Sequence, residues 1–434
     1  MLLFRYNKLR SVAPRGSLPE LISKAWSKNV RSYVNFSLSD LFGSDDYNAN
    51  VNAATKEADL ALPRVVRVRD RFVGPWDKES AKSLSSLLQW VLHDDKGTQE
   101  LKLIFKEMGH ANTLDLIKAH SRDTLDMDAV HDSTTNHVTW IGHATCAINI
   151  DGVRLLTDPM FSEYASIIQG IGSRRRVPAA TTVQDLPQTD VVLLSHTHYD
   201  HLDENSAQAI GNRPLWVVPL GVGKKLASFG ITNTVELDWW QECTMDIHRA
   251  NGSGHTTLAV VLTPAKHWTA RTPFDKNREL WGSFCVRSED SDTRLFFGGD
   301  TAYCDVFSTI GERYGPFDMA LLPIGAYKPR FFMKDVHCSP AEAVQIHMDL
   351  QAKQSLGVHW GTFSLANEDH IEPALELARA RSRAGLSAQD FFTLAHGSTL
   401  RFGNNPATLD FASAHDALFQ RYTVQVEAVE TEEQ

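Results

Sequence analysis

Four side chains that can bind metal ions lie within one six-residue segment of this chain, His196–His201 (HTHYDH). The apolar run Val191–Leu194 ends one residue before the segment, which predicts that the segment leaves the end of a buried strand. Imidazole nitrogens and carboxylate oxygens are ligands that Zn²⁺ accepts readily. Because neighbouring side chains diverge, these ligands cannot all reach one tetrahedral ion. The pattern favours two adjacent ions, with His196 and His198 on one and Asp200 and His201 on the other. The alternative is a polar strand-end loop with surface histidines.

Two coordination shells need further ligands, and three candidates follow later in the chain. His267, Asp300 and His359 each stand just after an apolar run that is typical of a strand. Each alone could be an ordinary polar loop residue. Together they complete a set in which Asp300 bridges both ions, His267 completes the first site and His359 completes the second. This repeated order of strand and ligand predicts a dinuclear metal-dependent hydrolase.

The ligand pattern and the longer motifs around it resemble the N-acylphosphatidylethanolamine-hydrolysing phospholipase D family of the metallo-β-lactamase superfamily. The superfamily signature is H-x-H-x-D-H followed by a later His, Asp and His. The resemblance covers about residues 71–402 and implies an α/β fold, the αββα four-layer sandwich, with the metals at one edge of the sheets. The motifs that carry it are Arg71–Trp76, Val138–Thr145, Leu156–Phe161, Glu236–Trp240, Gly298–Cys304, Pro323–Tyr327 and His359–Phe363.

The resemblance also implies a reaction. The enzyme would hold two Zn²⁺ ions per chain and hydrolyse N-acylphosphatidylethanolamine to N-acylethanolamine and phosphatidic acid. A hydroxide bridging the ions would attack phosphorus, with Asp300 and Asp200 as the catalytic carboxylates. Tyr199 and His337 would contact the substrate. Without the resemblance, Tyr199 could simply pack and His337 could be a surface-loop histidine.

Two more polar residues are candidates for orienting the metal ligands. Asp158, in a Thr-Asp-Pro segment, can accept an N–H from a ligand imidazole. His143, in a Gly-His-Ala segment, is the second candidate. A buried, hydrogen-bonded histidine at a strand end is the alternative for His143.

Composition limits the other classes of function. The net charge of −10 gives no general basis for nucleic-acid binding, so we expect no nucleic-acid partner. The five cysteines are widely spaced without a CxxC pair, which predicts reduced thiols in an intracellular protein. No segment approaches the roughly eighteen consecutive apolar residues of a spanning helix. A lipid substrate would therefore be reached by a peripheral membrane enzyme. A homodimer is left open.

The sequence divides into four expected segments. Residues 1–31 carry seven basic residues and one acid, which resembles a mitochondrial presequence. The alternative is a basic arm that touches anionic lipid. The segments are a targeting sequence with linker at 1–60, an N-terminal family extension packed on the catalytic domain at 61–135, the catalytic domain at 136–405 and an acidic tail at 406–434.

Short apolar strands alternate with turns and helices in the catalytic region. Helices are expected near 203–211, 340–350 and 371–384, and Ser339 with Glu342 predicts a capping box at the start of the second.

Three segments are candidates for a membrane-facing surface. An amphipathic helix is expected at 81–92, with core packing as its alternative. Basic residues flank Phe331, Phe332 and Met333, and this composition is typical of side chains that anchor a protein at a membrane surface. Arg174–Arg176 could contact anionic headgroups, although solvated loops are the usual alternative.

The family can carry a lysine at the position of Ala270, in a region that binds bile-acid-like amphiphiles, so such regulation is not expected here.

A second function would use the same ligands. The chain could be a soluble hydrolase of this superfamily that acts on a sugar lactone phosphate or a cyclic phosphodiester. The acidic charge disfavours a nuclease, and the complete ligand set disfavours a metal-free membrane adaptor.

Overall fold

The computed structural model describes residues 5–11, 62–76, 121, 125–248, 254–272 and 274–403. Contacts divide the chain into one unit of residues 1–10 and 64–434 and another of Ser11–Pro63. The helix expected at 81–92, most of the targeting segment and the acidic tail lie outside the described residues. The four segment boundaries therefore stay predictions.

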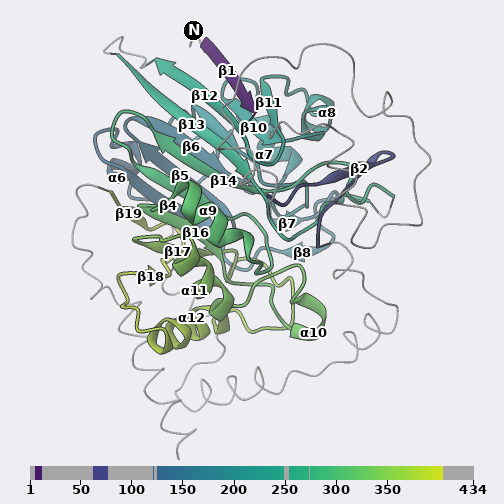
Figure 1. Cartoon of the computed structure of the whole chain (residues 1–434), viewed down its shortest axis with the longest axis vertical. Coiled ribbons are helices and arrows are strands. Elements are labelled where there is room, and N and C mark those ends of the chain that lie inside the picture. The colour runs from purple at the N-terminus through teal and green to yellow at the C-terminus, as the bar shows by residue number, and fades with distance from the viewer. Residues whose placement is uncertain are drawn as a thin grey trace, which may run out of the picture. The chain divides into compact units, whose positions relative to one another are not determined.

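The larger of two main sheets has eight strands (Figure 1). Strands β12 to β15 are antiparallel neighbours, and strands β15 to β18 run parallel. Strand β1, which comes from the expected targeting segment, lies at the sheet edge beside β12. In sheet order the strands are β1 (Arg5–Ser11), β12 (Gln241–His248), β13 (His255–Thr263), β14 (Ser283–Ser288), β15 (Arg294–Phe297), β16 (Met319–Pro323), β17 (Ser355–Val358) and β18 (Phe391–Phe392).

The second main sheet has seven strands. Its strands β4, β5 and β6 are antiparallel, β19 is antiparallel to β4, and β6, β9, β10 and β11 run parallel. In sheet order they are β11 (Thr234–Leu237), β10 (Leu215–Pro219), β9 (Val191–Leu193), β6 (Val153–Thr157), β5 (Thr145–Ile150), β4 (His137–Gly142) and β19 (Thr399–Arg401). Two small hairpins pair β2 (Val66–Val68) with β3 (Arg71–Val73), and β7 (Tyr164–Ala165) with β8 (Ser173–Arg174).

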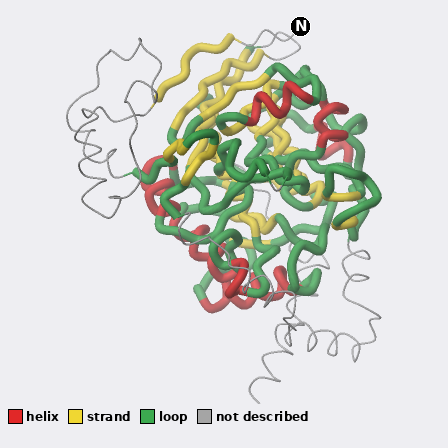
Figure 2. The backbone as a smooth tube through the Cα atoms, turned by 90° about the vertical axis from the view of Figure 1, so that its right-hand side faces the viewer, coloured by secondary structure: helices red, strands yellow, loops and turns green. Residues whose placement is uncertain are grey.

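Helices cover the outer faces of both sheets, which gives the αββα sandwich expected from the sequence (Figures 1 and 2). Val222 and Leu226 of α8 pack in one buried cluster with Trp216 and Val218 of β10. Helix α11 contacts β16 and its neighbour α9 on the eight-stranded sheet. The helices are α6 (Met127–His131), α7 (Glu204–Ile210), α8 (Val222–Ser228), α9 (Val306–Tyr314), α10 (Arg330–Met333), α11 (Pro340–Asp349) and α12 (Glu372–Arg383). No helix among the described residues is long and apolar enough to cross a membrane.

The predicted capping box of α11 is confirmed. The Ser339 hydroxyl accepts a hydrogen bond from the backbone N–H of Glu342 at 3.3 Å, and the Glu342 carboxylate accepts one from the backbone N–H of Ser339 at 2.7 Å. These bonds satisfy amide groups that the first turn of a helix leaves unpaired. They also fix the chain two residues after His337.

The metal-capable residues follow strand ends in both sheets. Asp158 directly follows β6, and the HTHYDH segment begins three residues after β9 ends. Asp300 and His359 follow β15 and β17 in the other sheet. The sandwich therefore positions these loops at one edge, where their side chains meet.

Candidate metal centre

The HTHYDH segment is a loop that two buried side chains hold in place. The carboxylate of Asp158 accepts hydrogen bonds from the backbone N–H (2.7 Å) and the hydroxyl (2.6 Å) of Ser195. The guanidinium of Arg271 donates to the carbonyl oxygens of Thr197 (3.0 Å) and Leu202 (2.7 Å), near the two ends of the segment. These contacts give the ligands of the loop a fixed geometry.

A first group of donor atoms comes from His196, His198, His267 and Asp300. One ligand atom of each lies within 4.8 Å of the others. Nε2 of His267 is 3.2 Å from Nδ1 of His198 and 3.7 Å from Oδ2 of Asp300. Nδ1 of His267 faces the carbonyl oxygen of Val336 at 2.8 Å, so it carries the proton and leaves Nε2 able to bind a cation. The structure thus brings together the four residues that the sequence assigns to one site.

A second group lies beside the first and contains His143, Asp200, His201 and His359. Asp300 contacts this group as well. Its Oδ1 is 3.0 Å from Nε2 of His359, and its Oδ2 is 3.2 Å from Nε2 of His201. A carboxylate that touches both groups has the position of a bridging ligand.

The donor atoms are better placed to bind cations than to form hydrogen bonds with one another. Among the described residues, Nε2 of His201, Nε2 of His359 and Oδ1 of Asp300 are buried and make no hydrogen bond of acceptable geometry. Leaving buried polar atoms unpaired is costly. A cation between these atoms would satisfy all of them, and mixed imidazole and carboxylate donors suit zinc and similar divalent ions.

Burial and neighbouring charges together set the protonation states of the donors. It lowers the pKa of both His198 and His143 to about 3, which keeps these imidazoles neutral. Burial alone would raise the pKa of Asp300, but the adjacent His201 and His359 hold it well below its usual range. Burial lowers the pKa of His359, but Asp300 and Asp200 raise it to about 9, so a proton there competes with a cation.

His143 and Asp158 contact different kinds of ligand. The expected contact of Asp158 with an imidazole is present, because its Oδ2 lies 2.6 Å from Nδ1 of His201. His143 lies in the turn between β4 and β5 with a positive φ of 55°, and its Nε2 is 2.8 Å from Oδ2 of Asp200. The hydrogen-bond partner of His143 is therefore a carboxylate, whereas the sequence suggested an imidazole.

An open cavity of about 540 Å³ leads to the donor atoms. Tyr199 and His337, the predicted substrate contacts, both line it, together with the apolar side chains of Trp268 and Leu365. Nδ1 of His337 is 3.9 Å from Oδ2 of Asp300. The cavity therefore combines metal-capable groups at its base with aromatic and aliphatic walls.

Arg271 is a residue of the site that the sequence reasoning missed. Its guanidinium carbon lies 4.7 Å from the centre of the Tyr199 ring, which is a cation–π contact. Together with its two hydrogen bonds to the loop, this contact fixes the phenol against the cavity wall. The sequence places Arg271 four residues after His267, which could have suggested that it lies near the site. Its contact with Tyr199 exists only in the folded chain.

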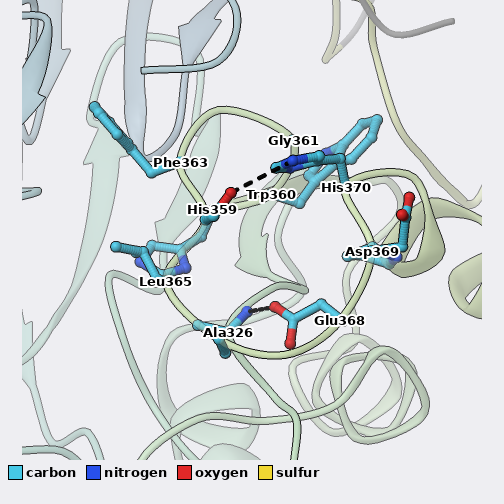
Figure 3. A pocket seen from close by; sticks show the side chains of 12 residues that line it. Ala326, His359, Trp360, Gly361, Phe363, Leu365, Glu368, Asp369 and His370 are labelled. Atoms are coloured by element: carbon cyan, nitrogen blue, oxygen red, sulfur yellow. Dashed lines mark hydrogen bonds between the residues drawn. The ribbon is translucent and has the colours of Figure 1, made fainter. Parts of the chain in front are cut away.

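A small pocket beside His359 is bounded by the loop that follows β17 (Figure 3). The carboxylate of Glu368 accepts hydrogen bonds from the backbone N–H groups of Ala326 (2.5 Å) and Lys328 (3.1 Å). Because these two residues follow β16, Glu368 ties the His359 loop to the neighbouring strand. Burial raises the pKa of Glu368 to about 7.

The expected membrane-facing residues of α10 are less exposed than the sequence suggested. Met333 is buried, so the prediction that it faces lipid is wrong, and Phe331 and Phe332 are half-buried. The guanidinium of Arg330 donates two hydrogen bonds to Glu342 at 2.8 and 3.0 Å. The short helix thus packs onto the start of α11.

Known proteins resemble the chain through this region. Residues 153–360 match the model of the beta-lactamase superfamily domain. The chain is 37% identical over 316 residues to the N-acyl-phosphatidylethanolamine-hydrolyzing phospholipase D 1 of Caenorhabditis elegans, across 69% of this chain and 86% of that protein. It is 38% identical over 243 residues to the mitochondrial enzyme of the same name in Saccharomyces cerevisiae, across 55% of this chain and 50% of the yeast protein. A metal-dependent hydrolase of Methanopyrus kandleri is 27% identical over 246 residues, across 54% and 88% of the two chains.

Proposed function

The chain belongs to the N-acylphosphatidylethanolamine-hydrolysing phospholipase D family of the metallo-β-lactamase superfamily, and we propose that it hydrolyses N-acylphosphatidylethanolamine to N-acylethanolamine and phosphatidic acid. It is a metal-dependent hydrolase. The observation that carries the proposal is the position of Asp300 between two groups of buried donors at the base of an open cavity.

We propose two Zn²⁺ ions as the cofactor. His196, His198, His267 and Asp300 would hold one ion, and Asp200, His201, His359 and the shared Asp300 would hold the other. Two such ions would lower the pKa of a water and neutralise charge on a phosphoryl oxygen.

The surrounding residues would keep the ligands in place. Asp158 would fix the Nδ1–H tautomer of His201, and His143 would orient the carboxylate of Asp200. Removal of such partners typically lowers metal affinity or activity about 10- to 100-fold.

Tyr199 and His337 would bind the substrate in the cavity. His337 lies close enough to Asp300 to donate to a phosphate oxygen above the donor groups. Arg271 holds the Tyr199 ring in one position. The phenol would therefore contact a lipid headgroup with little loss of side-chain conformational entropy. Trp268 and Leu365 offer apolar contacts for the first part of an acyl chain.

The location of the protein is also a proposal. The yeast relative is named mitochondrial, and residues 1–31 of this chain carry the basic excess of a presequence. We propose a mitochondrial, peripheral membrane enzyme. A reporter fused to residues 1–40 tests this, because a reporter that stays outside mitochondria contradicts it.

Product analysis by mass spectrometry tests the reaction. Purified protein is incubated with N-acylphosphatidylethanolamine, phosphatidylcholine or a water-soluble cyclic phosphodiester. The proposal expects N-acylethanolamine and phosphatidic acid, with label from ¹⁸O-water in phosphatidic acid. Label in N-acylethanolamine would mean attack at carbon, and exclusive cleavage of the soluble diester would indicate the alternative hydrolase.

A further inference from the structure

Exposed large apolar side chains gather in three short segments. Among the described residues, eight such side chains are exposed, and seven of them belong to the β2–β3 hairpin, the turn between β7 and β8, or the loop at 272–276. The β7–β8 turn alone contributes Ile167, Ile168 and Ile171, which are 57%, 61% and 65% exposed. Phe274 in the loop is 77% exposed. Exposed apolar clusters of this kind mark interaction surfaces.

The β7–β8 turn is ordered by its polar groups rather than by its isoleucines. The side-chain amide of Gln169 donates to the carbonyl oxygen of Tyr164 at 3.0 Å and accepts from the backbone N–H of Tyr164 at 3.1 Å. Gly172 has a φ of 108°, which other residues rarely adopt. The turn therefore keeps its shape while the isoleucines stay outside the core.

The three segments are attached to the walls of the metal cavity. On the β8 side, the Ser173 hydroxyl donates to the carbonyl oxygen of Ser364 at 3.1 Å, and the next residue, Leu365, lines the cavity. In the 272–276 loop, Lys276 also lines the cavity. Arg71 of β3 donates to the carbonyl oxygen of Phe274 at 2.8 Å, which joins the β2–β3 hairpin to that loop. The apolar segments thus border the entrance through which a substrate reaches the donor atoms.

Basic side chains accompany the apolar ones. Arg174 and Arg176 are exposed at the base of the β7–β8 turn, and Lys276 is exposed beside Phe274. Arg174 pairs with Glu163, but both groups are largely in water, where such pairs contribute little. The concentration of cations contrasts with the net charge of −10 of the whole chain.

We propose that the β7–β8 turn is a membrane anchor that inserts Ile167, Ile168 and Ile171 into an anionic phospholipid bilayer. Arg174, Arg176 and Lys276 would contact the headgroups, and Phe274 of the 272–276 loop would insert beside Lys276. In this orientation the cavity would open toward the lipid. The anchor rests on the proposed function, in which the substrate is a lipid. A second copy of the chain fits less well, because a two-fold contact through this face would bring like charges together.

Vesicle sedimentation tests the anchor without any hydrolysis. The full chain is mixed with vesicles of phosphatidylcholine and phosphatidylserine that contain no N-acylphosphatidylethanolamine. Replacing the three isoleucines by serine (I167S/I168S/I171S) should weaken vesicle binding at least about tenfold. Each isoleucine that is buried in the bilayer contributes to the free energy of binding, and serine does not. The matched control is M348S, which removes the one exposed large apolar side chain outside the three segments of the described chain. It should bind as the unaltered protein does.

A second measurement locates the contact. All five cysteines are buried, so I168C can be labelled selectively with an environment-sensitive dye. Its emission should shift to the blue on addition of vesicles, whereas the dye on M348C should not shift. R174Q/R176Q should lose binding to anionic vesicles and keep binding to neutral ones. Cleavage of a short-chain soluble phosphodiester analogue should not change in the isoleucine variant.

The outcomes separate the anchor from the reaction. Equal vesicle binding by the isoleucine variant and the unaltered protein overturns the anchor, even if N-acylphosphatidylethanolamine is hydrolysed. A dye shift that depends on protein concentration without vesicles also overturns it and indicates contact between copies. Vesicle binding that requires the isoleucines supports the anchor even if the lipid is not cleaved, in which case the proposed reaction fails alone.

Discussion

Nε2 of His143 lies 2.8 Å from Oδ2 of Asp200, and this contact joins the turn between β4 and β5 to the HTHYDH segment. The same turn reaches a second donor residue through the backbone, since the carbonyl oxygen of His143 accepts a hydrogen bond from the N–H of His359 at 2.9 Å. One residue therefore sets the positions of two members of the second donor group. The positive φ of His143 is a local cost that this arrangement requires.

Replacing His143 should weaken the second metal site more than the first. H143A removes the partner of the Asp200 carboxylate, so metal affinity at that site and kcat/KM should fall about 10- to 100-fold. H143Q, which can still donate to the carboxylate, should lie between H143A and the unaltered enzyme. Chelator competition measures the affinity.

A buried histidine away from the centre provides the control for H143A. His347 of α11 lies 2.8 Å from the hydroxyl of Ser355 and is outside both donor groups. H347A should lower the Tm and leave the metal content unchanged. If H143A binds two ions with unaltered affinity, His143 does not orient Asp200.

Asp300 should be needed for both metal sites. Its two oxygens lie near His359 and His201 in one group, and its Oδ2 lies 3.8 Å from Nε2 of His196 in the other. D300N removes the shared negative charge, so activity should fall by orders of magnitude and elemental analysis should show fewer than two ions per chain. An active D300N enzyme with two ions would rule out Asp300 as the bridge. D349N, a change in α11, serves as the control with normal metal content.

Arg271 should act on the substrate through Tyr199. R271K keeps the charge but cannot donate to two carbonyl oxygens in the planar geometry of a guanidinium. We expect kcat/KM to fall roughly tenfold, and unfolding free energy to fall by about 1–3 kcal/mol because a buried acceptor loses its partner. Y199F retains the ring under Arg271 and separates the role of the hydroxyl from that of the ring. If R271K leaves kcat/KM unaltered, the role of Tyr199 in catalysis does not depend on Arg271.

The sequence could predict which of the metal-capable residues come together because each stands at the end of an apolar strand. His267, Asp300 and His359 are distant from the HTHYDH segment in the sequence, and the arrangement of the strands brings them together. The types of these residues and their order along the chain were nevertheless enough to predict that they group. Helix α11 was equally accessible, since Ser339 and Glu342 encode its start locally.

Other elements carried weaker local signals. Helices α8 and α9 were not expected: Gly221 and Asp305 stand at their N-caps, and neither supplies a side-chain hydrogen bond. Strand β12 was also missed, although Cys243, Met245 and Ile247 alternate toward the core. The contacts of His143 with Asp200 and of Arg271 with Tyr199 depend on which loops meet in the folded chain, and spacing in the sequence does not encode that.

Glu368 should make stability depend on pH near neutrality. Burial raises the pKa of this carboxyl from its ordinary value of 4.5 to about 7 in the folded protein. A group with a raised folded-state pKa favours folding when it is protonated, so its contribution is fully present below pH 4.5 and is lost as the pH rises through about 7. E368Q stays neutral, but it can accept from only one of the two backbone N–H groups, because Ala326 and Lys328 donate to different oxygens of the carboxylate. This loss destabilises the variant by an amount that does not depend on pH. Its Tm relative to the unaltered protein should therefore rise between about pH 5 and pH 8, by the equivalent of about 2–3 kcal/mol of unfolding free energy. E376Q on α12, which removes a carboxylate that pairs with Arg379, is the matched control. A constant gap between E368Q and the unaltered protein across this range would mean that Glu368 is already ionised in the folded state at pH 5.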